Sequence, residues 1–218
     1  MDKDIAIYNK QAFVIIASRP GMGKTSLALD IARHLAKRSN KKILIISLDM
    51  SKEQVMARLQ KAENMPAEFG NILIDDQPLR SVKDIEELCQ NTENLGAVII
   101  DYLQLLIDDG QTQEKSSIRK LKQMTGNLDI PVICTCQTPR ACDFRENKRP
   151  LLDDLLITEA DYQYADQVLL LYRDRYYNPK TEAGDIAECI VAKNIYGNLG
   201  TVRLHWDPAR LSFSEQEQ

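Results

Sequence analysis

The sequence predicts an α/β fold with a mostly parallel central sheet, helices on both faces and a C-terminal antiparallel hairpin at the sheet edge. Three observations support this prediction. Apolar runs of strand length alternate with helical segments along most of the chain, the pattern of a parallel sheet covered on both faces. A glycine-rich stretch separates the first apolar run from the first helical segment. The last two apolar runs are joined by the short turn IYGNLG, which is typical of a hairpin.

The elements follow one another without a linker, so we predict one domain over residues 1–218. Strands are predicted at residues 12–18, 42–48, 71–76, 96–106, 131–137, 166–173, 187–194 and 201–206. Helices are predicted at residues 25–39, 51–64, 81–94 and 114–128. Two irregular stretches, 107–117 and 138–162, each follow a strand. They are therefore expected at the carboxyl edge of the sheet, where open α/β folds bind their ligands.

Composition excludes several classes of protein. With 44% hydrophobic residues the chain is not disordered, and no apolar run approaches the roughly 20 residues needed to span a membrane. The N-terminus MDKDIAIYNK is too polar for a secretory signal, and the five cysteines suit reduced thiols. We therefore predict a cytoplasmic protein without a membrane partner. The net charge of −4 means that any contact with nucleic acid is local, and residues 140–150 are the most basic short stretch.

The glycine-rich stretch SRPGMGKT, residues 18–25, fits the phosphate-binding pattern G-x-x-x-x-G-K-[ST] except at Ser18. Glycines at 21 and 23 let backbone N–H groups turn towards phosphate oxygens, and the following helix adds its positive dipole. Lys24 would bind the β- and γ-phosphates, and the Thr25 hydroxyl would bind Mg²⁺. An ordinary turn before a helix is the alternative, but strand, loop, lysine and threonine occur together. The predicted phosphate-binding residues are Arg19, Pro20, Gly21, Met22, Gly23, Lys24, Thr25 and Ser26.

Three polar residues at strand ends complete the predicted site. Asp101 ends the apolar run VIID and is expected to hold Mg²⁺ through water. Asp49, in ISLDM, is placed either to activate a water molecule or to cap the next helix, a position for which Ser51 competes. Gln137 ends the strand PVICTCQ and either responds to the γ-phosphate or simply faces solvent. Position alone leaves the last two choices open.

Taken in order, these motifs resemble one family, the bacterial replicative DNA helicases of the DnaB type, in their C-terminal RecA-like ATPase domain. The matching stretches are SRPGMGKTSLALDIA, ISLDMSKEQVMARL, VIIDYLQLL, LDIPVICTCQTPR, KRPLLDDL, ADQVLLLYRD and AKNIYGNLGTVRL. They span nearly the whole chain. DYLQL and the later series are more specific than a phosphate loop, and they argue against another RecA-type ATPase such as a recombinase or clock-type protein.

The resemblance implies a RecA-like P-loop NTPase that binds ATP and Mg²⁺, works as a hexameric ring and moves along single-stranded DNA. It gives Lys24, Asp49 and Gln137 catalytic roles, with Asp49 in place of the usual glutamate. It gives the metal to Thr25 and Asp101, and it places Lys193 in the neighbouring subunit's ATP site. The residues that it directs towards DNA are Arg140, Arg145, Lys148 and Arg149. A primase or a helicase loader is a possible partner.

The sequence also departs from the family. The N-terminal helical domain and linker helix are expected to be absent, so we expect weak or no assembly of this chain alone. The segment between Met50 and Asn71 is shorter than usual, Ile195 replaces the arginine finger, and LITEADYQYAD rewrites the usual DNA-facing loop. Two functions therefore compete. One is an ATP-dependent replicative helicase domain. The other is a catalytically weakened ATP-binding relative with a regulatory, loading or mobile-element role.

Overall fold

The computed structural model describes residues 11–63, 69–107 and 114–215. Within these residues one nine-stranded sheet has the order β3-β2-β4-β5-β1-β6-β7-β8-β9. The strands are β1 (Phe13–Ser18), β2 (Lys42–Ser47), β3 (Ile72–Asp75), β4 (Leu95–Asp101), β5 (Val132–Gln137), β6 (Gln167–Arg173), β7 (Ile186–Asn194), β8 (Gly200–Asp207) and β9 (Ser212–Glu215). Neighbours from β3 to β6 pair in parallel, and those from β6 to β9 pair antiparallel. The predicted fold class is therefore confirmed.

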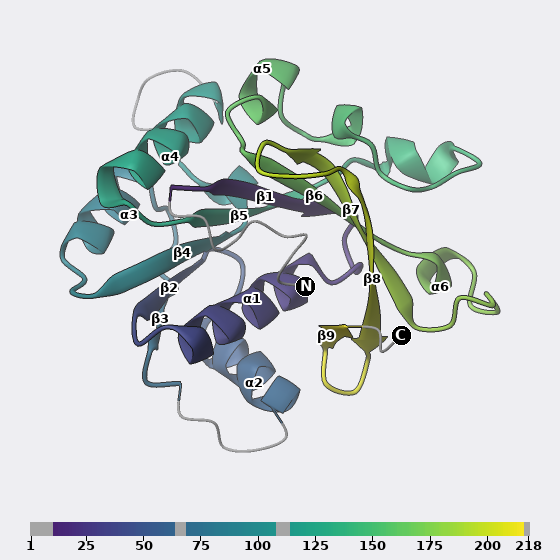
Figure 1. Ribbon diagram of the computed structural model, residues 1–218, viewed down its shortest axis with the longest axis horizontal. Coiled ribbons are helices and arrows are strands. Elements are labelled where there is room, and N and C mark those ends of the chain that lie inside the picture. The colour runs from purple at the N-terminus through teal and green to yellow at the C-terminus, as the bar shows by residue number, and fades with distance from the viewer. Residues whose placement is uncertain (1–10, 64–68, 108–113, 216–218) are drawn as a thin grey trace.

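Two hydrophobic cores lie on opposite faces of the sheet, as the alternation of side chains along a strand requires. In β1, Val14 and Ile16 belong to one core, whereas Phe13 and Ile15 belong to the other. The first core is covered by α1 (Lys24–Arg38) and α2 (Lys52–Glu63). The second is covered by α3 (Val82–Gln90) and α4 (Glu114–Leu128). Figure 1 shows these two helical layers on either side of the strands. No helix in the described ranges is long and apolar enough to cross a membrane.

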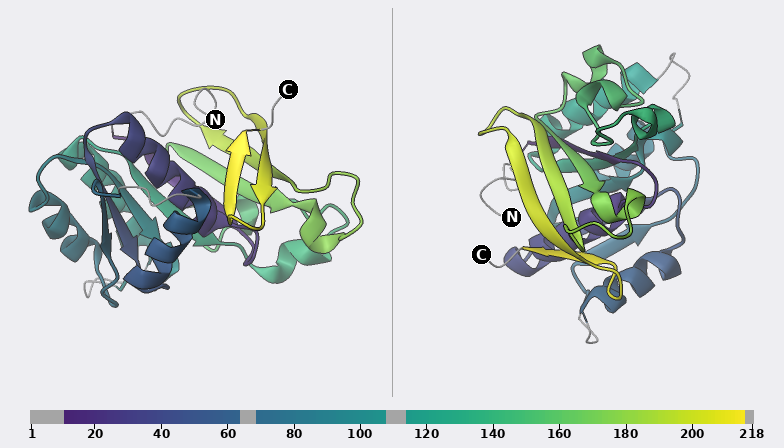
Figure 2. Two further views of the ribbon diagram at one scale, coloured as in Figure 1. Left: turned by 90° about the horizontal axis from the view of Figure 1, so that it is seen from below. Right: turned by 90° about the vertical axis from the view of Figure 1, so that its right-hand side faces the viewer.

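The antiparallel end of the sheet corrects the sequence prediction. The hairpin of β7 and β8 is present, but it is not the edge of the sheet, because β9 pairs with β8 beyond it. Figure 2 shows β8 and β9 turning back towards α1. The backbone N–H of Phe213 donates a 2.6 Å hydrogen bond to Asp30 of α1, which fixes β9 on that helix. The run LSFSE is too short and too polar for periodicity to reveal it.

Other boundaries differ where polar contacts override the apolar pattern. The predicted strand 96–106 ends at Asp101, and Leu103–Leu105 form a 3₁₀ turn. Residue 166 precedes β6 because the carboxylate of Asp166 accepts a hydrogen bond from the Phe13 N–H at 2.7 Å. The irregular stretch 138–162 contains short helical turns at Arg140–Phe144, Leu152–Asp154 and α5 (Glu159–Tyr162). A further short helix, α6 (Asp174–Tyr177), follows β6.

Candidate nucleotide-binding site

The carboxyl ends of four parallel strands bring the predicted site residues to one edge of the sheet. Ser18 at the end of β1 pairs with Gln137 at the end of β5. Ser47 at the end of β2 pairs with Asp101 at the end of β4. The sheet register therefore places the glycine-rich loop next to the ends of β4 and β5, as the sequence predicted for a nucleotide site.

The loop between β1 and α1 has the backbone shape of a phosphate cradle. Gly21 has φ 82° and Gly23 has φ 103°, in the left-handed region that favours glycine. A Cβ atom on Gly23 would lie 2.8 Å from Cζ of Phe213. Ser18, the one departure from the motif, is the last residue of β1, is fully buried, and donates a hydrogen bond to the Arg19 carbonyl at 3.0 Å. It needs no left-handed backbone, which explains why serine replaces glycine there.

Asp101 is the polar centre of this edge. Its side chain is only 7% exposed, and the Thr25 hydroxyl donates to Oδ2 at 2.8 Å. The Thr135 hydroxyl donates to Oδ1, and the Lys24 ammonium lies 3.8 Å from the same oxygen. The ammonium also lies 4.9 Å from the centre of the Tyr102 ring. Hard oxygen donors beside a lysine and a helix N-terminus suit both Mg²⁺ and phosphate. The residues present therefore fit the predicted metal and triphosphate.

The structure decides against the cap as the role of Asp49. The cap of α2 belongs to Ser51, whose hydroxyl accepts from the Gln54 N–H at 3.4 Å while Gln54 Oε1 accepts from the Ser51 N–H at 2.9 Å. Asp49 itself is exposed. Burial raises the pKa of Tyr102, and the negative charges of Asp49 and Asp101 raise it further. Asp49 therefore faces the same edge as Asp101, and its catalytic role stays a prediction.

Gln137 is held at this edge by a residue that the sequence motifs did not single out. Gln104 donates to the Gln137 carbonyl at 3.3 Å and accepts from the Gln137 N–H at 3.3 Å. It also donates to the Cys136 sulfur at 3.0 Å. Gln104 is the polar residue inside the DYLQL motif, and that interruption of an apolar run was the available signal. The amide of Gln104 thus joins the end of β5 to the turn after β4.

Lys193 does not lie at this edge. It pairs with Val168 near the beginning of β6, at the opposite edge of the parallel sheet from the glycine-rich loop. Its ammonium donates to the carbonyls of Gln163 at 2.6 Å and Tyr162 at 3.2 Å, next to α5. Burial lowers its pKa. Ile195, two residues further on, is 60% exposed at the tip of the hairpin. Lys193 is therefore remote from the phosphate loop of its own chain.

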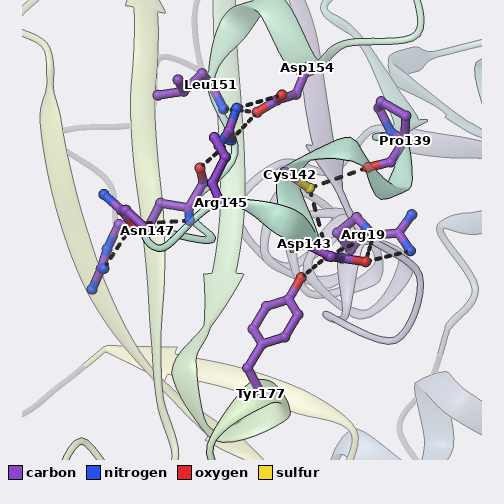
Figure 3. A network of polar contacts seen from close by, with 10 residues as sticks. Arg19, Pro139, Cys142, Asp143, Arg145, Asn147, Leu151, Asp154 and Tyr177 are labelled. Atoms are coloured by element: carbon purple, nitrogen blue, oxygen red, sulfur yellow. Dashed lines mark hydrogen bonds and ion pairs between the residues drawn. The ribbon is translucent and has the colours of Figure 1, made fainter.

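The predicted DNA-facing residues divide into two groups. Arg145 forms an ion pair with Asp154 at 2.5 Å, and Arg149 donates to both oxygens of Glu188 at 2.6 Å. Lys148 donates to the carbonyls of residues 143 and 145 at 2.8 and 3.2 Å. Figure 3 shows Arg145 turned towards Asp154. These three side chains hold the segment after β5 in place. Arg140 is exposed, and the described residues give it no ion pair.

An aromatic wall lies beside the glycine-rich loop, and the sequence did not predict it. Trp206 and Phe213 have ring centres 4.7 Å apart, and both pack against Gly23. The Arg173 guanidinium lies 4.4 Å from the centre of the Trp206 ring, and burial lowers its pKa. No sequence pattern places Trp206 beside the loop, because the contact depends on β9 folding back onto α1.

The remaining thiols and carboxylates do not form a metal centre among the residues that the structure describes. All five cysteines are free and buried. Burial raises the pKa of the Cys89 and Cys189 thiols to about 12. These cysteines therefore pack as neutral side chains.

Comparison with known proteins agrees with this geometry. The family model described as the DnaB-like helicase C terminal domain matches residues 1–68 and 59–215. The replicative DNA helicase DnaB of Geobacillus stearothermophilus is 35% identical over 237 residues, covering 94% of this chain and 52% of the relative. The replicative DNA helicase DnaC of Bacillus subtilis gives the same identity and coverage. This chain therefore spans about half the length of the curated relatives that it matches.

Solved structures give the same result. One of them, an isolated ATPase domain, superimposes with a TM-score of 0.86 at 31% identity, covering 96% of this chain and 86% of that one. A DnaB-like replicative helicase, solved together with its interactions with primase, gives 0.87 at 31% identity and covers 96% of this chain and 58% of that one. The two family-model matches meet at residues 59–68, inside the segment that is short in this sequence. From its sequence motifs, its sheet order and these matches, the chain belongs to the family of DnaB-like helicase C-terminal domains.

Proposed function

We propose that this chain is the ATPase domain of a replicative DNA helicase, which binds ATP with Mg²⁺ and couples hydrolysis to movement along single-stranded DNA in the cytoplasm. One observation carries the proposal. The side chains of Lys24, Thr25 and Asp101 converge at the end of the glycine-rich loop, with a hydrogen bond of 2.8 Å between Thr25 and Asp101. This is the set of groups that P-loop ATPases use for triphosphate and metal.

Each group has a distinct part in the proposal. Backbone N–H groups from Gly21 to Thr25 would hold phosphate oxygens, and Lys24 would neutralise the β- and γ-phosphates. Thr25 and Asp101 would hold Mg²⁺, which supplies positive charge where negative charge develops. Asp49 would orient and deprotonate the attacking water from the end of β2. Gln137 would respond to the γ-phosphate at the end of β5.

The position of the hairpin supports a homo-oligomer. Lys193 and Ile195 lie at the sheet edge opposite the phosphate loop. The hairpin can therefore act only on the nucleotide of another copy. A head-to-tail arrangement that closes makes a ring and repeats the same contact at every interface. We propose such a ring for the assembled protein, with single-stranded DNA contacted by Arg140 and a primase or loader as a further partner.

The weakened relative is the second candidate, and the exposed Ile195 favours it. An arginine finger contributes on the order of 10³-fold or more to hydrolysis, and isoleucine supplies no charge. Because Ile195 is 60% exposed, Ile195→Arg is accommodated without repacking. If the chain is a weakened motor, this substitution raises the steady-state ATPase rate under conditions where copies associate. An unchanged rate would show that another cation already serves the neighbour's site.

Titration of the purified chain with fluorescent ATP tests the proposal directly. We expect saturable binding that requires Mg²⁺ and is abolished by Lys24→Ala, because the removed ammonium is the positive charge at the loop. Lys83→Ala is the matched control, since Lys83 is a surface residue of α3 whose ion pair with Glu87 is 3.8 Å long. Absence of metal-dependent uptake by the unsubstituted chain would overturn the proposed function.

A further inference from the structure

The side chain of Arg19, a residue of the phosphate loop, points away from the phosphate cradle. Its Nε lies 3.2 and 3.1 Å from the two carboxylate oxygens of Asp143, and a second nitrogen lies 3.1 Å from Oδ2. A third nitrogen donates to the Thr138 carbonyl at 2.8 Å. Figure 3 shows this contact. Arginine paired in this forked way with a carboxylate is fixed in orientation as well as in distance. The guanidinium is 14% exposed, so water screens the pair only weakly.

Asp143 is also tied to the loop by a second route. The Tyr177 hydroxyl donates to its Oδ1 at 2.5 Å. The Tyr177 ring packs edge-on against Tyr176, with ring centres 5.1 Å apart. Tyr176 in turn lies over the loop, because a Cβ atom on Gly21 would be 2.9 Å from its Cε2. One carboxylate therefore contacts the phosphate loop directly through Arg19 and indirectly through α6.

The backbone of Asp143 belongs to the segment that carries the exposed Arg140. Both residues lie in one 3₁₀ turn, Arg140–Phe144. Lys148 donates to the Asp143 carbonyl at 2.8 Å and lies 5.7 Å from the centre of the Tyr177 ring, which ties the rest of the segment to the same point. A displacement of Arg19 or Tyr177 is therefore transmitted to residues 140–149 without passing through the hydrophobic core.

We propose that the Arg19–Asp143 ion pair links the phosphate loop to the segment 140–149, so that nucleotide binding changes the conformation of that segment. Arg19 and Asp143 are then positioning residues, acting through the loop and through Arg140. This inference rests on the proposed function, since it needs a nucleotide on the loop. It differs from the role assigned to Gln137, because the link runs through a charged side-chain pair rather than through the end of β5.

Hydrogen exchange measured by mass spectrometry tests the link in the purified chain. With a non-hydrolysable ATP analogue and Mg²⁺, we expect slower exchange in residues 18–25 and a change in residues 138–149. Asp143→Asn keeps the shape of the side chain but removes its charge. In this variant the analogue still slows exchange in residues 18–25, while the response of residues 138–149 is lost. Asp143→Glu, which restores the carboxylate, recovers part of that response.

Arg175→Gln is the matched control, because it breaks a 2.5 Å ion pair with Asp185 in the same region without touching the loop. We expect its exchange pattern to follow that of the unsubstituted chain. If Asp143→Asn keeps the full response of residues 138–149, the proposed link is wrong. It is equally wrong if the unsubstituted chain takes up the analogue and residues 138–149 do not respond. Failure of the unsubstituted chain to take up the analogue at all would instead contradict the proposed function.

A binding measurement gives a second readout that a merely structural role would not change. The affinity for a labelled oligothymidine is measured by anisotropy with and without the analogue at one salt concentration. Coupling between two sites typically changes affinity about 5- to 150-fold, and we expect a factor in this range for the unsubstituted chain. For Arg19→Gln and Asp143→Asn it falls towards one, and the double variant shows no further loss. The same factor in all four proteins would overturn the link.

Discussion

The Thr25 hydroxyl and the Asp101 carboxylate are joined by a 2.8 Å hydrogen bond, although the two residues are 76 positions apart in the chain. The contact exists because β1 and β4 end at the same edge of the sheet with β5 between them. It brings two oxygen ligands suited to Mg²⁺ within reach of one ion, next to the Lys24 ammonium.

The first prediction concerns Asp101→Asn. The substitution keeps the size of the side chain and removes the charge that would hold the metal through water. We expect the Mg²⁺ concentration needed for ATP binding to rise about 10- to 100-fold, the usual cost of losing an outer-sphere partner. The measurement is a Mg²⁺ titration at fixed fluorescent ATP. Asp75→Asn, at the end of β3, is the control, because Asp75 pairs with Arg80. An equal shift in both variants would refute a metal role for Asp101.

Glycine substitutions separate backbone strain from crowding. Gly184 has φ 59°, and a Cβ atom added to it would have nothing within 4 Å, so Gly184→Ala measures the left-handed backbone alone, about 1–2 kcal/mol. Gly23→Ala also drives a Cβ into the buried ring of Phe213, which adds about 1–3 kcal/mol. Urea unfolding gives both free energies of unfolding. If Gly23→Ala costs no more than Gly184→Ala, the packing of β9 against the loop does not constrain that residue.

The sequence predicted the parallel part of the fold because its strands are buried on both faces and are interrupted by capped helices. Ser81 and Asp84 illustrate this, forming a capping box at the beginning of α3. The phosphate loop and Asp101 were equally predictable, since their spacing and their position after apolar runs are local features. The catalytic interpretation of Asp49 gained support only when the structure gave the cap to Ser51.

What the sequence could not provide depends on long-range contacts. Three of the four cations predicted to face DNA are held by partners from 3 to 39 residues away, such as Glu188 for Arg149. No periodicity records such a pairing. Strand β9 was missed because only pairing with β8 and contact with α1 define it. The link from Arg19 to Asp143 spans 124 residues and connects two loops.

The shortened side chain at position 49 gives a gain-of-function prediction. Asp49→Glu extends the carboxylate by about one C–C bond towards the attacking water. Since a displacement near 1 Å costs roughly 10²-fold in rate, we expect a rise in steady-state hydrolysis of up to about that factor, with little change in ATP affinity. Asp49 is exposed, so the fold tolerates the extra methylene. Asp49→Asn should lower hydrolysis while ATP still binds. If Asp49→Glu is no faster than the unsubstituted chain, the reach of this carboxylate does not limit the rate.

Two tyrosines predict a loss of stability at alkaline pH. Burial, together with hydrogen bonds to Asp174 and Asp143, raises the pKa of Tyr172 and Tyr177 respectively. The folded protein therefore keeps both hydroxyls protonated at a pH where the unfolded chain ionises them. The unfolded state binds fewer protons there, so stability is fully present below about pH 10 and falls as the pH rises towards the folded values.

Each of these tyrosines steepens the decline by up to about 1.4 kcal/mol per pH unit. Tyr172→Phe is the cleaner test, because its hydroxyl contacts Asp174 at 2.7 Å and leaves Asp143 untouched. We expect a lower free energy of unfolding at neutral pH and a shallower fall between about pH 10 and pH 11 in urea titrations. Tyr164→Phe, at a 40% exposed residue, is the control and should keep the slope of the unsubstituted chain. If Tyr172→Phe keeps that slope too, ionisation of this hydroxyl does not drive the alkaline transition.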